Sequence, residues 1–126
     1  MKVLNIIESA YRATIEEQDD TIVWLTHAMN GAGADLAVFL CGNAVNYAAR
    51  TQDAAGLAFG GWRQTQPPRI ADDIASFVAK GVTVYILAED LAQRGLETRD
   101  LISGLERITR DDLPGILAAH DQIWHW

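Results

Sequence analysis

A single cysteine is the side chain of this sequence with the most direct potential for chemistry. Cys41 follows the apolar run Ala37–Leu40 and precedes Gly42 and Asn43, two residue types that turn a chain. This pattern places the thiol where a strand ends and a helix begins, and backbone N–H groups at such a position can stabilise a thiolate. The chemistry would be that of a nucleophile or a persulfide carrier. The alternative is a buried small apolar residue, since free cysteine is among the most buried residue types.

The rest of the sequence contains no second group that would make Cys41 an enzyme nucleophile. Cys41 is the only cysteine, so no partner thiol exists for an intramolecular disulfide, and no histidine lies near it in the sequence. A nucleophilic thiol needs an activating base or a strongly lowered pKa. We therefore expect a protein that is not an enzyme, with sulfur carriage by Cys41 as the open alternative.

The three histidines do not form a metal-binding pattern. His27, His120 and His125 lack the His-x-x-x-His spacing of a metal site, and His120, near the end of a helix, is expected to cap a backbone carbonyl. The sequence also contains neither Gly-x-Gly-x-x-Gly nor Gly-x-x-x-x-Gly-Lys-Ser/Thr, the motifs of dinucleotide and P-loop sites. We therefore expect no metal and no other cofactor.

Three further segments combine residue types that are frequent in binding sites. Glu8, Tyr11 and Arg12 follow the first apolar run, where a loop either touches a ligand or is solvated. The segment Gly60-Gly61-Trp62-Arg63 could close over a ligand or fill a subunit contact, because Trp and Arg are enriched at interfaces, or its tryptophan could be buried and pin the loop. Trp124-His125-Trp126 places two aromatic rings on one face of the last strand, which favours core or subunit packing.

The elements that position these residues follow from the hydrophobic pattern. Five short apolar runs predict strands, and amphipathic segments between them predict helices. The predicted strands are Val3–Ile7, Leu36–Leu40, Val82–Leu87, Leu105–Ile108 and Ile123–Trp126; the predicted helices cover residues 12–30, 45–50, 70–80 and 89–94, with one more opening at Thr109. The glycines and prolines between residues 56 and 68 mark a long loop.

Apolar strands that alternate with amphipathic helices are typical of a parallel sheet covered on both faces. We therefore predict one α/β domain over residues 1–126, a three-layer sandwich with about five mostly parallel strands. Ligands bind such sheets at the carboxyl ends of the strands. Those ends are Glu8–Arg12, Cys41–Tyr47, Leu87–Asp90 and the turn after Ile108.

Composition excludes several classes of partner. The chain of 126 residues has a net charge of −7, and its ten basic residues are scattered, so we expect no nucleic acid and no anionic membrane as a partner. No apolar run approaches the ~20 residues of a membrane span, and the first residues are too short an apolar run for a signal peptide. With one cysteine, a cytoplasmic location is expected.

One segment resembles a known family. The stretch from Gly81 to Leu96, GVTVYILAEDLAQRGL, resembles the central stretch of the DsrE/DsrF-like family, which includes the Tus-type sulfur-relay subunits and YchN-like proteins. In that pattern a helix ends in glycine, a strand follows, and a cysteine-bearing turn precedes Arg-Gly and an aliphatic residue. Other parts of the pattern resemble residues 39–47, 101–106 and 112–123, so the resemblance covers nearly the whole chain.

The resemblance implies a compact α/β subunit of a homo- or hetero-oligomer, often a trimer or hexamer, that handles sulfur as a cysteine persulfide. The carrier cysteine of the family would fall at Leu87, and Ile86, Ala88 and Glu89 are not cysteine either. Leucine cannot carry sulfur. The resemblance therefore implies a non-carrier or supporting subunit, assembled with itself as a homotrimer or homohexamer or with a cysteine-bearing paralogue.

Two alternatives remain open at the level of sequence. Cys41 could act as carrier from the neighbouring strand end, if the second and third strands flank the first. The fold could instead serve as a small-ligand-binding or assembly protein. The expected pocket residues are Glu8, Tyr11, Asn43, Leu87, Glu89 and Arg94.

Overall fold

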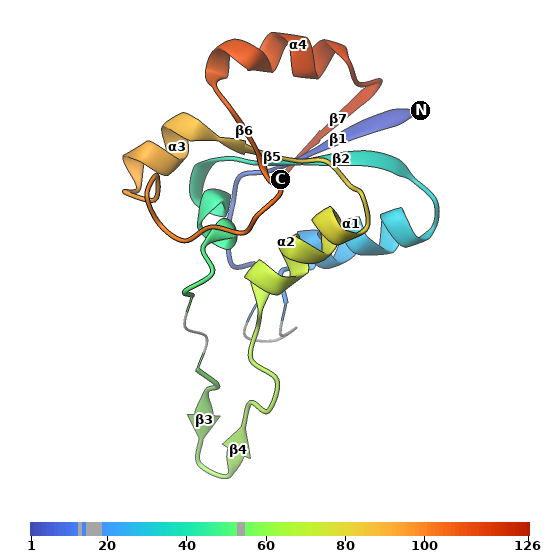
Figure 1. The fold of residues 1–126 in the computed structure, drawn as a ribbon. Coiled ribbons are helices and arrows are strands. Elements are labelled where there is room, and N and C mark those ends of the chain that lie inside the picture. Colours follow the sequence, from blue (N-terminus) through green and yellow to red (C-terminus); the bar gives the residue numbers. More distant parts are fainter. Residues whose placement is uncertain (13, 15–18, 53–54) are drawn as a thin grey trace.

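A five-stranded parallel sheet is the centre of the fold. The computed structural model describes residues 1–12, 14, 19–52 and 55–126. The strands lie in the order β6-β5-β2-β1-β7, and each neighbouring pair is parallel (Figure 1). They are β1 (Lys2–Ile7), β2 (Asp35–Leu40), β5 (Val84–Leu87), β6 (Glu106–Ile108) and β7 (Gln122–His125). The five predicted strands are present, and the predicted α/β class is confirmed.

Helices cover both faces of the sheet, so the molecule has three layers (Figure 1). One face carries α1 (Thr21–Gly31), α2 (Ile70–Ala79) and the 3-10 helix η1 (Gly42–Ala48), and the other carries α4 (Leu113–Ala118). Successive side chains of a strand point to opposite faces, so each apolar run supplies two cores. In β1, Ile7 packs in the core beneath α1 and α2, whereas Ile6 packs in the core beneath α4.

The first helix is shorter than the spacing of residues 12–30 predicts. α1 begins at Thr21 because the buried carboxylate of Asp20 caps it, accepting hydrogen bonds from the backbone N–H groups of Ile22 (2.8 Å) and Val23 (3.0 Å). Ile15, which the spacing places on the helical face, lies outside the described residues. The predicted end of the helix at Gly31 is confirmed.

The chain also turns earlier than predicted after β2. The sequence predicts a helix over residues 45–50, but η1 already begins at Gly42, whose φ of 53° lies in the left-handed region that favours glycine. The later helices match their predictions more closely: α2, α3 (Ala88–Gln93), and the short helix η2 (Arg110–Asp112) that leads into α4. Thr109 caps η2 as expected, through a reciprocal pair of hydrogen bonds with Asp112.

The long loop between η1 and α2 contains a small hairpin that the sequence analysis does not predict. β3 (Ala58–Phe59) and β4 (Trp62–Arg63) pair antiparallel and project away from the sheet and its helices (Figure 1). Across the described part of the chain, no helix is long and apolar enough to cross a membrane.

Candidate functional site

The fold brings Cys41 and Leu87 to neighbouring strand ends. The second strand, β2, lies between β1 and β5, so the third apolar strand flanks the second rather than the first. Leu40 is level with Ile86 in this pairing, and the next residues along the two strands are Cys41 and Leu87. Both side chains pack in the apolar cluster beneath α4. Leu87 is buried and Cys41 is half-buried, so the thiol lies against this cluster at the carboxyl edge of the sheet.

The surroundings of Cys41 keep its thiol protonated. Its pKa is raised to about 12, first by burial and then by the negative charges of Glu8 and Asp90, against a smaller opposing effect of Arg94. A thiol beside carboxylates is the reverse of the electropositive setting in which reactive cysteines occur. Near neutral pH, Cys41 is therefore a neutral and weakly nucleophilic side chain.

Asp90 ties the Cys41 turn to helix α3. Its carboxylate is buried, accepts a hydrogen bond from the backbone N–H of Gly42 at 2.5 Å, and forms an ion pair with Arg110 at 3.6 Å. A Cβ atom on Gly42 would lie 2.7 Å from Cγ of Glu8, so glycine also allows the turn to approach the end of β1. The acidic group that faces the thiol thus has a structural role in holding the turn.

Glu8 forms an ion pair with a histidine from the far end of the chain. Nε2 of His125 lies 2.6 Å from the Glu8 carboxylate. The pair forms because β7 lies beside β1, with His125 level with Ile6. The sequence shows no histidine near Cys41, and only this pairing of the last strand with the first brings His125 to the carboxyl edge.

The other polar residues of this edge bind one another. Oδ1 of Asn43 accepts hydrogen bonds from Nη2 (2.9 Å) and Nε (3.3 Å) of Arg94. One carboxylate oxygen of Glu89 accepts from the backbone N–H of Arg110 at 2.8 Å, and the other is buried without a hydrogen-bond partner among the described residues. Asn43, Glu89 and Arg94 are predicted pocket residues, and in the structure their hydrogen bonds link α3 to η1 and η2.

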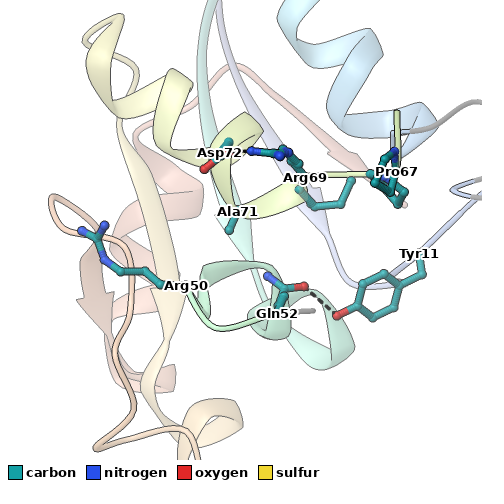
Figure 2. Close-up of a pocket in the computed structure, with 9 residues that line it drawn as sticks. Tyr11, Arg50, Gln52, Pro67, Arg69, Ala71 and Asp72 are labelled. Carbon is teal, nitrogen blue, oxygen red and sulfur yellow. Dashed lines mark hydrogen bonds and ion pairs between the residues drawn. The ribbon is translucent and has the colours of Figure 1, made fainter. Parts of the chain in front are cut away.

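A separate cavity lies away from these residues, and of the predicted pocket residues only Tyr11 lines it. It measures about 770 Å³ and is open to one side. Figure 2 shows the phenol of Tyr11 pointing toward Gln52, to whose Oε1 it donates a hydrogen bond of 2.9 Å. Arg50 instead points away from this pair, toward Asp100 and the carbonyl of Leu101. Among the described residues, this cavity is lined by Tyr11, Arg50, Gln52, Pro67, Pro68, Arg69, Ile70, Ala71 and Asp72.

A buried network fixes the position of Tyr11. The hydroxyl of the buried Tyr47 donates a hydrogen bond to the carboxylate of Asp20 and accepts one from the backbone N–H of Tyr11. Tyr11 has a φ of 60°, which is uncommon for a residue other than glycine. Burial and the bond to Asp20 raise the pKa of Tyr47 well above its ordinary value, so its hydroxyl remains a donor. One end of the cavity is therefore held rigidly by the same carboxylate that caps α1.

The remaining predictions about single residues have mixed outcomes. Nδ1 of His120 lies 2.7 Å from the carbonyl oxygen of Ile116, as expected of a residue that caps a helix end. Trp124 and Trp126 pack against the core beneath α1. Trp62 is about half exposed on the hairpin, so the interpretation that a buried tryptophan pins this loop is wrong. Among the described residues, no group of three or more His, Cys, Asp or Glu side chains could hold a metal ion.

Comparison with known proteins identifies the fold. No protein-family model matches the chain, and no curated protein matches it either. Among solved structures, it is similar to the YchN protein of E. coli, with a TM-score of 0.75 and 21% identity over 99% of this chain and 98% of that one. It is also similar to MTH1491 of Methanobacterium thermoautotrophicum, a protein of unknown function, with a TM-score of 0.61 and 12% identity over 98% and 96% of the two chains.

These likenesses cover both chains almost completely, so the whole arrangement of strands and helices is shared. The chain thus shares the α/β fold of YchN, and YchN-like proteins belong to the family that the Gly81–Leu96 segment resembles. At identities of 21% and 12%, the likeness establishes the fold alone.

Proposed function

We propose that this protein is an oligomeric subunit of the DsrE/DsrF-like kind, associated with intracellular sulfur transfer, and that it supports a carrier rather than carrying sulfur itself. The shared fold supports the association with sulfur transfer. The residue at the expected carrier position supports the non-carrier role, because Leu87 is a buried aliphatic side chain with no group that could hold a sulfur atom.

The observation on which the proposal depends most is the environment of Cys41. To accept sulfur, its thiolate would have to attack the terminal sulfur of a donor persulfide and release the donor as a thiolate. With a pKa of about 12, roughly one thiol in 10⁵ is ionised at pH 7. The only cysteine of the chain therefore does not substitute for the missing carrier.

The partners proposed for this subunit are those that the family resemblance implies. Such a chain assembles with itself, as a homotrimer or homohexamer, or with a cysteine-bearing paralogue that supplies the thiol. In either assembly this chain contributes the wall of the site around Leu87 and the polar edge that includes Glu8, Asp90 and Arg94.

Intact-mass measurement tests the proposal. The native protein is incubated at pH 7 with a low-molecular-weight persulfide and weighed, alongside Cys41→Ser. We expect no mass increase in either protein. A gain of one sulfur atom in the native protein that is absent from Cys41→Ser would overturn the non-carrier role and make Cys41 the carrier.

The cavity beside Tyr11 favours a second candidate function, the binding of a small molecule. Its volume of about 770 Å³ is within the usual range for ligand pockets, and Tyr11, Gln52 and Arg69 supply polar groups. On this alternative, a native mass spectrum of the purified protein contains a bound small molecule. The bound molecule should be absent from the spectrum of Tyr11→Ala. It should be retained in Asn43→Ala, because Asn43 does not line this cavity.

A further inference from the structure

The hairpin between η1 and α2 is an exposed aromatic arm, defined here as residues 55–66. Phe59 and Trp62 stack on each other with ring centroids 6.0 Å apart, yet their exposed fractions are 65% and 49%. The Gly60-Gly61 turn joins two strands of two residues each, and the arm extends away from the rest of the molecule (Figure 1). A short two-stranded hairpin is marginally stable by itself in water. The arm is therefore a structure that a contact with another surface would stabilise.

A groove of matching chemistry lies between α1 and β7. Its volume is about 480 Å³, and it is lined by Leu25, Met29, Trp124, His125 and Trp126. β7 is an edge strand of the sheet, and α1 also exposes Trp24. Contiguous apolar surface of this kind is typical of a protein interaction site.

The arm and the groove are on different parts of the chain. The arm leaves the body next to η1 and α2 and points away from the sheet, whereas the groove is formed by α1 and the last strand (Figure 1). The arm of a molecule therefore does not reach its own groove in this fold. A contact between the two surfaces joins two copies and is heterologous, and repetition of such a contact closes into a ring when the rotation allows it.

Charge favours a second copy as the partner. The arm contains Arg63 and no acidic residue, so its charge is +1. The net charge of the chain is −7, which leaves −8 on all other residues. Beside the groove, His125 is bound to the carboxylate of Glu8, and Asp121 directly precedes β7. A positively charged apolar arm is thus complementary to the acidic body of another copy.

The available area fits a weak to moderate contact. An aromatic side chain buries ~150–250 Å² when fully covered, so the exposed parts of Phe59 and Trp62 would supply a few hundred Å² on the arm side. A standard interface buries ~800 Å² per partner. In a ring each copy makes two such contacts, one through its arm and one through its groove, so ring closure stabilises contacts that are individually below the standard size.

From these observations we infer that the arm of one copy docks in the α1–β7 groove of a second copy, with Phe59 and Trp62 against Leu25, Met29 and the two C-terminal tryptophans. This inference rests on the oligomeric part of the proposed function and names the two surfaces that form the assembly.

A complementation experiment with two variants tests the inference. The arm variant is Phe59→Ser/Trp62→Ser, which removes the exposed aromatics. The groove variant is Leu25→Lys, which places a positive charge opposite Arg63, at a side chain that lines the groove without packing in either core. Molar mass is measured by light scattering at micromolar concentration. We expect an oligomer for the wild type and a monomer for each variant alone. The mixture is measured again at submillimolar concentration, where we expect a 1:1 heterodimer, because one intact arm and one intact groove remain and a single contact is weaker than a closed ring.

Leu117→Ser is the matched control, because Leu117 is an exposed apolar residue on α4, outside both surfaces, and this variant should keep the wild-type mass. An arm variant with the wild-type oligomeric mass overturns the inference and leaves the proposed oligomeric subunit intact. A mixture that remains monomeric also overturns it. A monomeric wild type contradicts both the inference and the oligomeric part of the proposed function. The sulfur-loading experiment tests the non-carrier role separately and does not depend on these mass measurements.

Discussion

At the scale of single residues, the chemistry of Cys41 is decided by side chains that are distant in sequence. The thiol lies at a strand end, as its sequence context predicts, and this is the position at which a parallel sheet binds ligands. Glu8 comes from the end of β1, and Asp90 comes from the first turn of α3. Together with burial they turn a candidate nucleophile into a neutral thiol.

Removing one of these charges should make Cys41 more reactive. Glu8→Gln takes away a negative charge that disfavours the thiolate, so the pKa of Cys41 should fall from about 12 and alkylation at pH 8 should accelerate severalfold. Arg94→Gln should have the opposite effect, since Arg94 lowers that pKa. The rate of native-state alkylation as a function of pH measures both. Equal rates for the two variants at pH 8 would contradict the electrostatic explanation.

The buried carboxylate of Asp20 should be the most sensitive polar position for stability. It accepts bonds from two backbone N–H groups of α1 and from the hydroxyl of Tyr47, so Asp20→Ala leaves three buried donors without their acceptor. We expect a loss of about 3 kcal/mol in the free energy of unfolding, and about 1–2 kcal/mol for Tyr47→Phe. Urea unfolding measures both values. A loss below 1 kcal/mol for Asp20→Ala would show that the network is not a stabilising one.

The residue scale is also where prediction from sequence is least complete. Cys41, Asn43, Leu87, Glu89 and Arg94 do gather at one edge, because each follows or flanks a predicted strand end. Tyr11 is predicted to lie in the same pocket. The hydrogen bond from its backbone N–H to the hydroxyl of Tyr47 instead holds it beside the cavity that Gln52 and Arg69 line. The contact of His125 with Glu8 is not predicted, because it depends on strand order, which local sequence patterns do not encode.

At the scale of elements, the apolar runs predict all five strands, since a strand buried on both faces needs no polar interruption. Helix ends are less predictable, because they depend on capping bonds. Capped by Asp20, α1 begins nine residues later than the spacing of residues 12–30 indicates, and η1 begins at Gly42, three residues earlier than predicted. The β3–β4 hairpin is too short to produce a periodic signal.

A series of three glycine substitutions separates backbone strain from collision. Gly42→Ala combines a φ of 53° with a Cβ 2.7 Å from Glu8, so we expect a loss of about 2 kcal/mol or more in stability. Gly33→Ala has a φ of 93° and open space around its Cβ, and should cost about 1 kcal/mol. Gly31→Ala, in α1 with neither problem, should be neutral or stabilising by ~0.5 kcal/mol. Urea unfolding that ranks Gly42→Ala as the mildest would refute the tight turn.

The carboxyl group of Asp73, in the first turns of α2, should make the stability of the protein depend on pH. Burial, and then the charges of Asp19 and Asp72, raise the pKa of Asp73 from 3.8 to about 6. The folded state therefore binds this proton more tightly than the unfolded state, and the resulting stability is fully present below pH 3.8 and lost as the pH rises through 6. Asp73→Asn should thus stabilise the protein at pH 7, by about 0.5 kcal/mol after allowance for solvent screening.

The comparison of unfolding free energies at pH 7 and pH 4 checks this assignment. The benefit of Asp73→Asn should shrink as the pH falls and disappear near pH 4, whereas Asp35→Asn, an exposed carboxylate at the start of β2, serves as the control. A benefit of the same size at both pH values would place its origin in packing rather than in protonation.

At the scale of the whole molecule, the class of the fold is predictable because alternating strands and helices allow few arrangements. The strand order β6-β5-β2-β1-β7 is not, since it depends on which crossovers the complete core accepts. This order determines one feature on which the proposed function depends and one on which the proposed arm–groove contact depends. It places Cys41 beside Leu87 and under the influence of Glu8, and it makes β7 an edge strand next to α1, where the proposed partner groove lies.

The central claim is that the folded chain does not carry sulfur, and the most direct test compares its native and unfolded states. Both are exposed to the same persulfide donor at pH 7, and the intact masses are recorded. We expect no added sulfur on the native protein and one added sulfur atom on the urea-unfolded protein. In the unfolded chain the pKa of Cys41 returns to its ordinary value near 8.5, so a larger fraction of the thiol is ionised. Equal loading of Cys41 in both states would contradict the central claim.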